Sequence, residues 1–169
     1  MTRPLLLLDV DGVLCPFGLG TPDREWNYAN TTDYGIRFAR DLSDMLVALA
    51  ERFELVWATA WEHQANDELT TLFGLPRLEV IEFSTDMEFA FLPAPGTTWK
   101  LPSIERFVGT QACAWVDDDI GYDAHDWARV RAEPTLLLEI DPRNGLDADH
   151  VETLLGFAEL AGETGHRVF

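Results

Sequence analysis

Two aspartates, Asp9 and Asp11, stand one residue apart in the stretch LLLLDVDGVLCPFG near the start of the chain. Residues two apart on a strand point to the same face, so both carboxylates address one ligand if the strand geometry continues to Asp11. Gly12 follows at once, and a glycine lets the backbone turn sharply and a ligand come close. The pair therefore predicts a functional site at the end of a buried strand.

Three consecutive aspartates, at positions 117–119, follow a second apolar run, AWV. Carboxylates that converge on one place repel one another and raise one another's pKa values unless a cation lies among them. A hard divalent ion with oxygen ligands fits, and Mg²⁺ is typical where a substrate phosphate completes the coordination. Zinc is not expected, because no group of histidines and cysteines has a suitable spacing.

Lys100 is the only lysine of the chain, and the other eleven basic residues are arginines. The compact charge of an ammonium group is not interchangeable with the planar guanidinium fork. Lys100 also opens an expected helix, where a positive side chain opposes the helix dipole. We therefore expect a nearby anion or carboxylate to compensate its charge.

Short apolar runs alternate with amphipathic stretches, which is typical of repeated strand–helix units and a parallel sheet. The strands are nearly continuous in hydrophobicity, which favours burial on both faces. The expected strands are Leu5–Asp9, Glu54–Ala58, Leu78–Ile81, Ala112–Val116 and Thr135–Ile140, and the expected helices are Ile36–Arg52, Glu62–Phe73, Leu101–Val108, Tyr122–Ala132 and Ala148–Leu160. We predict an α/β fold: a single Rossmann-like three-layer domain over residues 1–169 with a five-stranded parallel sheet.

Polar residues follow several of these strands directly. Ligands of an open parallel sheet bind at the carboxyl ends of the strands. The residues expected at that edge are Asp9, Asp11 and Gly12 after the first strand, Thr59 and Trp61 after the second, and the aspartates 117–119 after the fourth. Their clustering predicts one site.

Two stretches interrupt the alternation: residues 16–34 are expected to form a loop or hairpin flap, and residues 83–98 an irregular loop. Neither is long enough for a domain, so no large cap domain and a relatively open site are expected. Three aromatic residues of the flap, Trp26, Tyr28 and Tyr34, either contact a substrate or pin the flap to the body. Cys15, close to the first aspartates, is expected to be a small packing residue.

The composition bounds the class of protein. The 169 residues, 47% of them hydrophobic, suit one globular domain, and 30 acidic residues against 12 basic ones give a net charge of −18. Such a surface repels polyanions at long range, and its few cations argue against extended nucleic-acid binding. No stretch approaches the roughly 20 apolar residues of a membrane span. With no targeting segment and two distant cysteines, a cytoplasmic protein is expected.

Four segments, LLLLDVDGVL, LVWATAW, WK and AWVDDD, resemble in order the four motifs of the haloacid dehalogenase-like (HAD) phosphohydrolase superfamily. The resemblance implies a capless, Mg²⁺-dependent phosphatase that works through an aspartyl-phosphate. In this superfamily the phosphatases carry an aspartate two residues after the nucleophile and the dehalogenases lack it. Asp11 therefore favours phosphoryl chemistry.

The resemblance also implies a role for each residue by its position. Asp9 is the implied nucleophile and Asp11 the implied general acid/base. Phosphate binding falls to Thr59, Ala60 and Lys100, and metal binding to Asp9, Asp11 (through its backbone carbonyl), Asp117 and Asp118. The three consecutive acids leave an alternative metal pair open, Asp119 with Asp123.

A narrower resemblance lies in ELVWATAWEHQAN and IDPRNGLDADHVETLLGFA, which are similar to capless HAD proteins related to the HAD domains of multidomain RNA-repair proteins. It implies removal of a phosphate from a nucleic-acid end. The expected partner is thus a phosphorylated small molecule or the phosphorylated end of a macromolecule. The alternative is a regulatory module that binds phosphate with negligible turnover. The presence of both Asp9 and Asp11 argues against it, since binding alone needs no proton shuttle.

Overall fold

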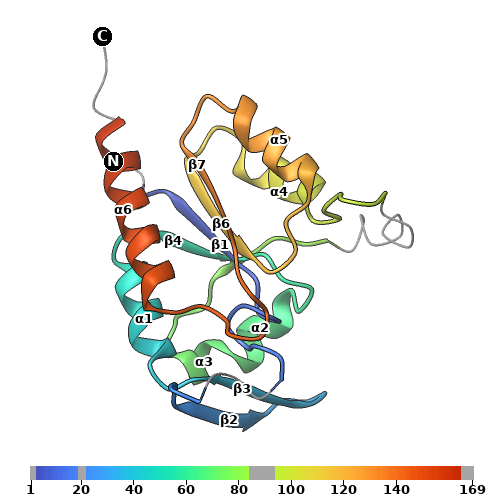
Figure 1. The fold of residues 1–169 in the computed structure, drawn as a ribbon, viewed down its shortest axis with the longest axis vertical. Helices are drawn as coiled ribbons and strands as arrows, with labels where there is room; N and C mark the ends of the chain where they lie inside the picture. Colours follow the sequence, from blue (N-terminus) through green and yellow to red (C-terminus); the bar gives the residue numbers. More distant parts are fainter. Residues whose placement is uncertain (1–2, 19–21, 84–93, 165–169) are drawn as a thin grey trace.

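A five-stranded parallel sheet forms the centre of the computed structural model, which describes residues 3–18, 22–83 and 94–164 (Figure 1). Its strands are β1 (Leu5–Leu8), β4 (Glu54–Trp57), β5 (Glu79–Val80), β6 (Cys113–Asp117) and β7 (Thr135–Glu139). They lie in the order β5-β4-β1-β6-β7, and every neighbouring pair is parallel. The predicted α/β fold with a five-stranded parallel sheet is confirmed.

Helices cover both faces of the sheet and make a three-layer arrangement (Figure 1). They are α1 (Leu42–Ala50), α2 (His63–Glu68), α3 (Thr70–Phe73), α4 (Leu101–Val108), α5 (Tyr122–Val130) and α6 (Ala148–Thr164). Alternate residues of β1 enter opposite cores: Leu6 and Leu8 pack with α1, α3 and α6, and Leu5 and Leu7 pack with α4 and α5. The leucine run is therefore apolar because both faces of its strand are buried.

The expected helix Ile36–Arg52 is wrong in its first part. Residues Gly35–Ala39 form strand β3, which pairs antiparallel with β2 (Trp26–Asn30) in a hairpin. Ile36 and Phe38 alternate along β3 and are buried in the core beside α1, so a strand period of two runs directly into a helical period. The predicted flap is thus a hairpin that continues to residue 39, and residues 19–21 lie outside the described part.

The region between β4 and β6 also departs from expectation. The expected helix Glu62–Phe73 is divided into α2 and α3, where the Thr70 hydroxyl donates to the Asn66 carbonyl oxygen at 2.7 Å. Such a bond from a side chain back to the preceding turn bends a helix. The Asn66 side chain also hydrogen-bonds the backbone of Leu78: its amide donates to the Leu78 carbonyl oxygen, and its Oδ1 accepts from the Leu78 N–H. Because these backbone groups are taken, β5 is short. Of the expected loop 83–98, residues 84–93 lie outside the described part.

The strand order fixes where a ligand site belongs. From β1 the chain adds β4 and β5 on one side, then returns to add β6 and β7 on the other. The direction of winding therefore reverses between β1 and β6, and ligands of open α/β sheets bind in the crevice at the carboxyl ends of the strands at such a point. Asp9 directly follows β1, and Asp117 is the last residue of β6. Among the residues that the structure describes, no helix is both long and apolar enough to cross a membrane.

Candidate active site

The ammonium group of Lys100 lies between two carboxylates from neighbouring strands. Its Nζ is 2.8 Å from Asp9 Oδ2 and 2.6 Å from Asp117 Oδ2. All three side chains are almost completely buried. The carboxylates are the compensation that the position of Lys100 at the start of α4 led us to expect.

Neighbouring donors fix both carboxylates in place. The Val10 N–H donates to Asp9 Oδ1 at 2.8 Å. The indole N–H of Trp115 donates to Asp117 Oδ2 at 3.2 Å, and the Asp119 N–H donates to Asp117 Oδ1 at 3.1 Å. Each acid therefore accepts hydrogen bonds on both oxygens, and its orientation is set before any ligand arrives.

The buried charges do not balance. Burial lowers the pKa of Lys100, but Asp9 and Asp117 more than offset this and hold it above its ordinary value. Burial raises the pKa of Asp117 to about 7, where Lys100 opposes the rise and Asp9 adds to it. Burial and then Asp9 also raise the pKa of Asp118. One ammonium among three carboxylates leaves an excess of negative charge that a cation would relieve.

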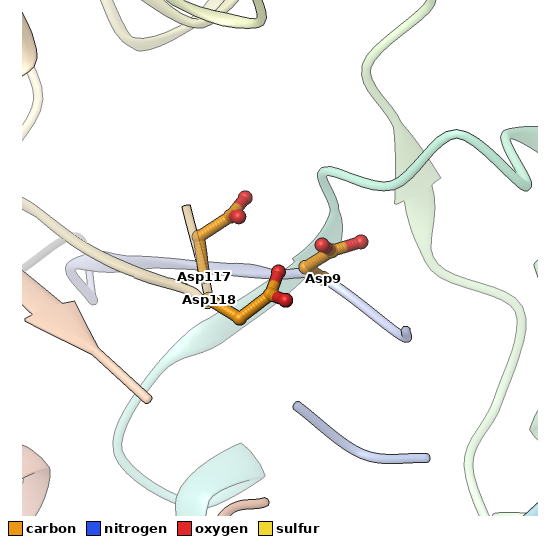
Figure 2. A group of neighbouring side chains, drawn as sticks. All are labelled: Asp9, Asp117 and Asp118. Atoms are coloured by element: carbon orange, nitrogen blue, oxygen red, sulfur yellow. The ribbon is translucent and has the colours of Figure 1, made fainter. Parts of the chain in front are cut away.

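The donor set fits a hard divalent cation. Asp9, Asp117 and Asp118 each offer one oxygen, and these oxygens lie within 4.8 Å of one another (Figure 2). Gly12 makes room for one of them: its φ is +74°, and a Cβ at this position would collide with the Asp118 carboxylate. Carboxylate oxygens alone, with no nitrogen or sulfur donor in the group, suit Mg²⁺ better than zinc.

Asp11 is held apart from this group by two aromatic donors. The Trp61 indole N–H donates to Asp11 Oδ2 at 2.9 Å, and the Tyr34 hydroxyl donates to Asp11 Oδ1 at 3.3 Å. Burial raises the pKa of Tyr34 to about 12, and Asp11 adds to the rise, so the phenol keeps its proton and donates. The sequence indicated Trp61 as a polar residue at this edge, but nothing in the pattern revealed its contact with Asp11.

Thr59 and Ala60 lie just past β4, on the other side of β1 from Asp117. Thr59 is completely buried, and its Oγ1 accepts a hydrogen bond from the Trp61 N–H at 3.4 Å. Ala60 is exposed, in the turn that leads into α2. Two of the three residues expected to bind phosphate thus follow the strand next to that of Asp9.

Asp123, a member of the alternative metal pair, stands outside the group of three aspartates found among the described residues. Both of its carboxylate oxygens accept from the Thr98 N–H, at 2.9 and 3.0 Å. The Thr98 Oγ1 in turn accepts from the Gly121 N–H at 2.5 Å. Asp119 is exposed and stands outside the group that could hold a metal among the described residues. Asp123 and Thr98 therefore join the start of α5 to the segment that carries Lys100, a connection that the sequence did not reveal.

Three further candidates from the sequence are Trp26, Tyr28 and Cys15. Trp26 lies under the guanidinium groups of Arg24 and Arg37, at 5.3 and 4.3 Å from its ring centre, whereas Tyr28 is exposed. Burial raises the pKa of Cys15 to about 12, with Asp11 and Asp9 adding to the rise, so the thiol stays protonated as a packing group.

One comparison with known proteins places this geometry in a family. A family model described as the HAD domain in Swiss Army Knife RNA repair proteins matches residues 5–151. The match spans β1 to the start of α6 and includes every site residue described above. No curated protein matches the chain.

Proposed function

The chain belongs to the family of HAD domains in Swiss Army Knife RNA repair proteins, and from this premise we propose that it is a Mg²⁺-dependent phosphatase acting on a phosphomonoester. Membership supports a HAD-type phosphohydrolase in general. The observation that carries the proposal is the buried Lys100 ammonium between Asp9 and Asp117, with Asp118 beside them. With a divalent cation held by the three carboxylates, the group would have enough positive charge for a phosphate, and the Lys100 ammonium would then help to neutralise it.

In the first step, an oxygen of Asp9 attacks phosphorus and the bond from phosphorus to the leaving oxygen breaks. Asp11 gives its proton to that oxygen, which leaves as an alcohol. The product on the enzyme is an aspartyl-phosphate. Lys100 steadies the attacking carboxylate and neutralises a phosphoryl oxygen, and Thr59 hydrogen-bonds the phosphoryl group.

In the second step, a water attacks the phosphorus of the aspartyl-phosphate and Asp11 takes the proton of that water. The bond between phosphorus and Asp9 breaks, which releases inorganic phosphate and restores the free carboxylate. Asp11 must therefore serve as acid and then as base at one place. The hydrogen bonds from Trp61 and Tyr34 orient the carboxyl group of Asp11, which both steps require at the same place.

Asp9, Asp117, Asp118 and the backbone carbonyl of Asp11 would hold the Mg²⁺. When bound, the ion supplies the positive charge that lets a carboxylate approach a phosphate dianion. The all-oxygen donor group and the uncompensated charge of its three carboxylates support this assignment.

For the substrate, we propose the phosphorylated end of an RNA. The family description names RNA repair proteins, which favours this substrate over a phosphorylated metabolite. Between β1 and α1 the described part of the chain forms a single two-stranded hairpin, so a polymer end has room to approach. A net charge of −18 agrees with contacts that are limited to the end of the RNA.

The test is the hydrolysis of an aryl phosphate, and of oligoribonucleotides with a 3′- or 5′-phosphate, in Mg²⁺ and after its removal by EDTA. We expect turnover that needs Mg²⁺ and disappears in Asp9→Asn, because an amide is a poor nucleophile. Phosphate binding without turnover on any substrate would instead indicate a regulatory module. Equal rates in the wild type and in Asp9→Asn would refute the assigned nucleophile.

A further inference from the structure

We propose that the ring of Tyr34 forms one wall of the subsite for the leaving group and selects a nucleoside there, by stacking on the base of the terminal nucleotide. The inference rests on the proposed function, in which Asp11 protonates the leaving oxygen. It goes beyond that function because it names the residue that recognises what is attached to the phosphate.

Tyr34 combines contact with Asp11 and exposure to solvent. Its hydroxyl lies 3.3 Å from Asp11 Oδ1, and its ring meets that of Trp61 edge to face with centroids 5.5 Å apart. Even so, 49% of the residue is exposed. A tyrosine that served only to orient Asp11 or pin the flap would not need to leave half of its surface open to solvent.

The end of the flap is anchored, so the position of this ring is defined. The Thr31 hydroxyl donates to the Tyr34 carbonyl oxygen at 2.7 Å and closes the turn between β2 and β3. The Thr32 N–H donates to Glu68 Oε2 at 2.7 Å, and the Gln64 amide donates to Asp33 Oδ2 at 2.8 Å. The turn is therefore fastened to α2, beside the residues that follow β4.

The position of Asp11 identifies which part of a substrate meets Tyr34. A general acid must lie within hydrogen-bond reach of the leaving oxygen when it delivers its proton. Groups in contact with the acid on its exposed side therefore adjoin the leaving group, and Tyr34 is such a group. The moiety carried by that oxygen, a ribose with its base, must pass along the exposed ring.

The chemistry of the wall favours a planar, uncharged group. Aromatic side chains stack on bases without regard to sequence. Stacking also needs no cation, which matters in a chain of net charge −18 with Asp33 and Glu68 in the same turn contacts. Trp26 offers no alternative, because the guanidinium groups of Arg24 and Arg37 lie against its ring. Tyr28 is on the same hairpin and 75% exposed, which makes it a matched control.

The experiment compares two short oligoribonucleotides that differ at one point: the phosphorylated terminal nucleotide carries its base, or is an abasic analogue. The values of kcat/KM are measured for the wild type, Tyr34→Phe, Tyr34→Leu and Tyr28→Leu, with thermal melts. We expect the wild type to prefer the base-bearing substrate on the order of 10-fold, as one stacked base gives. Tyr34→Phe should keep this ratio, Tyr34→Leu should reduce it to about 1, and Tyr28→Leu should leave it unchanged.

A wild-type ratio of 1, or a ratio that Tyr34→Leu leaves intact, would overturn the inference. So would an equal effect of Tyr34→Leu and Tyr28→Leu. The same pair of oligonucleotides is also titrated against Asp9→Asn and its double variants with the Tyr34 changes, which measures binding without turnover. Absent turnover in the wild type, with a base preference in binding that depends on Tyr34, would refute the proposed function and leave the recognition by Tyr34 standing.

Discussion

Lys100 is the cation around which the acidic side chains of this site are arranged. Its ammonium contacts Asp9 at the end of β1 and Asp117 at the end of β6, and only 5% of the residue is exposed. A single point charge satisfies two carboxylates from different strands at once. The planar guanidinium of arginine is wider and directs its donors along fixed lines.

Lys100→Arg is therefore expected to lower the turnover of an aryl phosphate by about 10²-fold although the formal charge is kept, since misplacing a catalytic group by about 1 Å costs on that order. Turnover and a thermal melt are measured for both proteins. Retained activity would make the shape of the cation irrelevant. Loss of activity together with loss of the folded state would make Lys100 a structural residue.

Gly12 allows the Asp118 carboxylate to approach β1. Gly12→Ala places a methyl group against that carboxylate and also forces alanine to φ of +74°. We expect a higher Mg²⁺ concentration for half-maximal turnover, measured by titration of the metal. Gly74→Ala is the matched control, because Gly74 has φ of +71° with nothing within 4 Å of the added atom. If the Mg²⁺ concentration for half-maximal turnover rose equally in both variants, backbone strain of roughly 1–2 kcal/mol would explain the effect.

Residue types revealed part of this site and concealed another part. The sole lysine and the clustered acids could be identified from the sequence because few structural roles require them together. The hydrogen bonds of Asp11 could not, because they come from Tyr34 and Trp61, which are 23 and 50 positions away. No local pattern encodes which aromatic side chain will face a given carboxylate.

Among the elements, the start of α5 and the segment before α4 depend on each other. Asp123 and Thr98 connect them through the hydrogen bonds described above, and the Tyr122 N–H donates to the Gly96 carbonyl oxygen at 2.7 Å. Lys100 stands two residues after Thr98. The placement of its ammonium group is thus set partly by a helix that carries none of the expected catalytic residues.

Asp123→Ala should therefore displace the Lys100 ammonium group and lower turnover. The chain has one lysine, so labelling with [ζ-¹⁵N]lysine gives a single side-chain signal that reports this displacement without catalysis. We expect that signal to shift or broaden in Asp123→Ala and to stay unchanged in Asp126→Ala, an exposed acid of the same helix.

Turnover gives a second measure of the same connection. If Asp123 acts through Lys100, Asp123→Ala should cause no further loss in a Lys100→Ala background. The connection would be contradicted if the loss of turnover in the double variant equalled the product of the two single losses. An unchanged lysine signal in Asp123→Ala would also contradict it.

The elements themselves were predictable where one period dominates. The buried strands could be predicted because their apolar runs are nearly continuous, and each of the five differs from expectation by a single residue at one or both ends. The first helix was misjudged because Phe38 fits both the period of β3 and that of α1, and only pairing with β2 decides between them. The shortness of β5 follows from the Asn66 side chain, a tertiary contact 12 positions from Leu78.

At the scale of the whole molecule, a net charge of −18 surrounds a site proposed to bind a dianion. The buried Lys100 and the Mg²⁺ that the acidic group would hold provide attraction only at short range. At longer range the surface repels a polyanion, and salt screens that repulsion within a Debye length of about 8–10 Å at 0.1–0.15 M. Binding of an RNA end is thus a balance between local attraction and general repulsion.

This balance predicts the sign of the salt effect. Proteins that bind nucleic acid through many phosphate contacts lose affinity steeply as salt rises, because counterions are released. Here we expect kcat/KM for a 3′- or 5′-phosphorylated oligoribonucleotide to stay level or rise between 50 and 200 mM NaCl, at a fixed Mg²⁺ concentration. Lengthening the oligonucleotide beyond a few nucleotides should bring no gain, since each added phosphate meets an acidic surface. An aryl phosphate serves as the control for direct effects of salt on the chemistry. A steep fall of kcat/KM with salt, together with tighter binding of longer RNA, would show that basic residues form an extended nucleic-acid-binding surface despite the net charge. The proposal that contacts are confined to the RNA end would then be wrong.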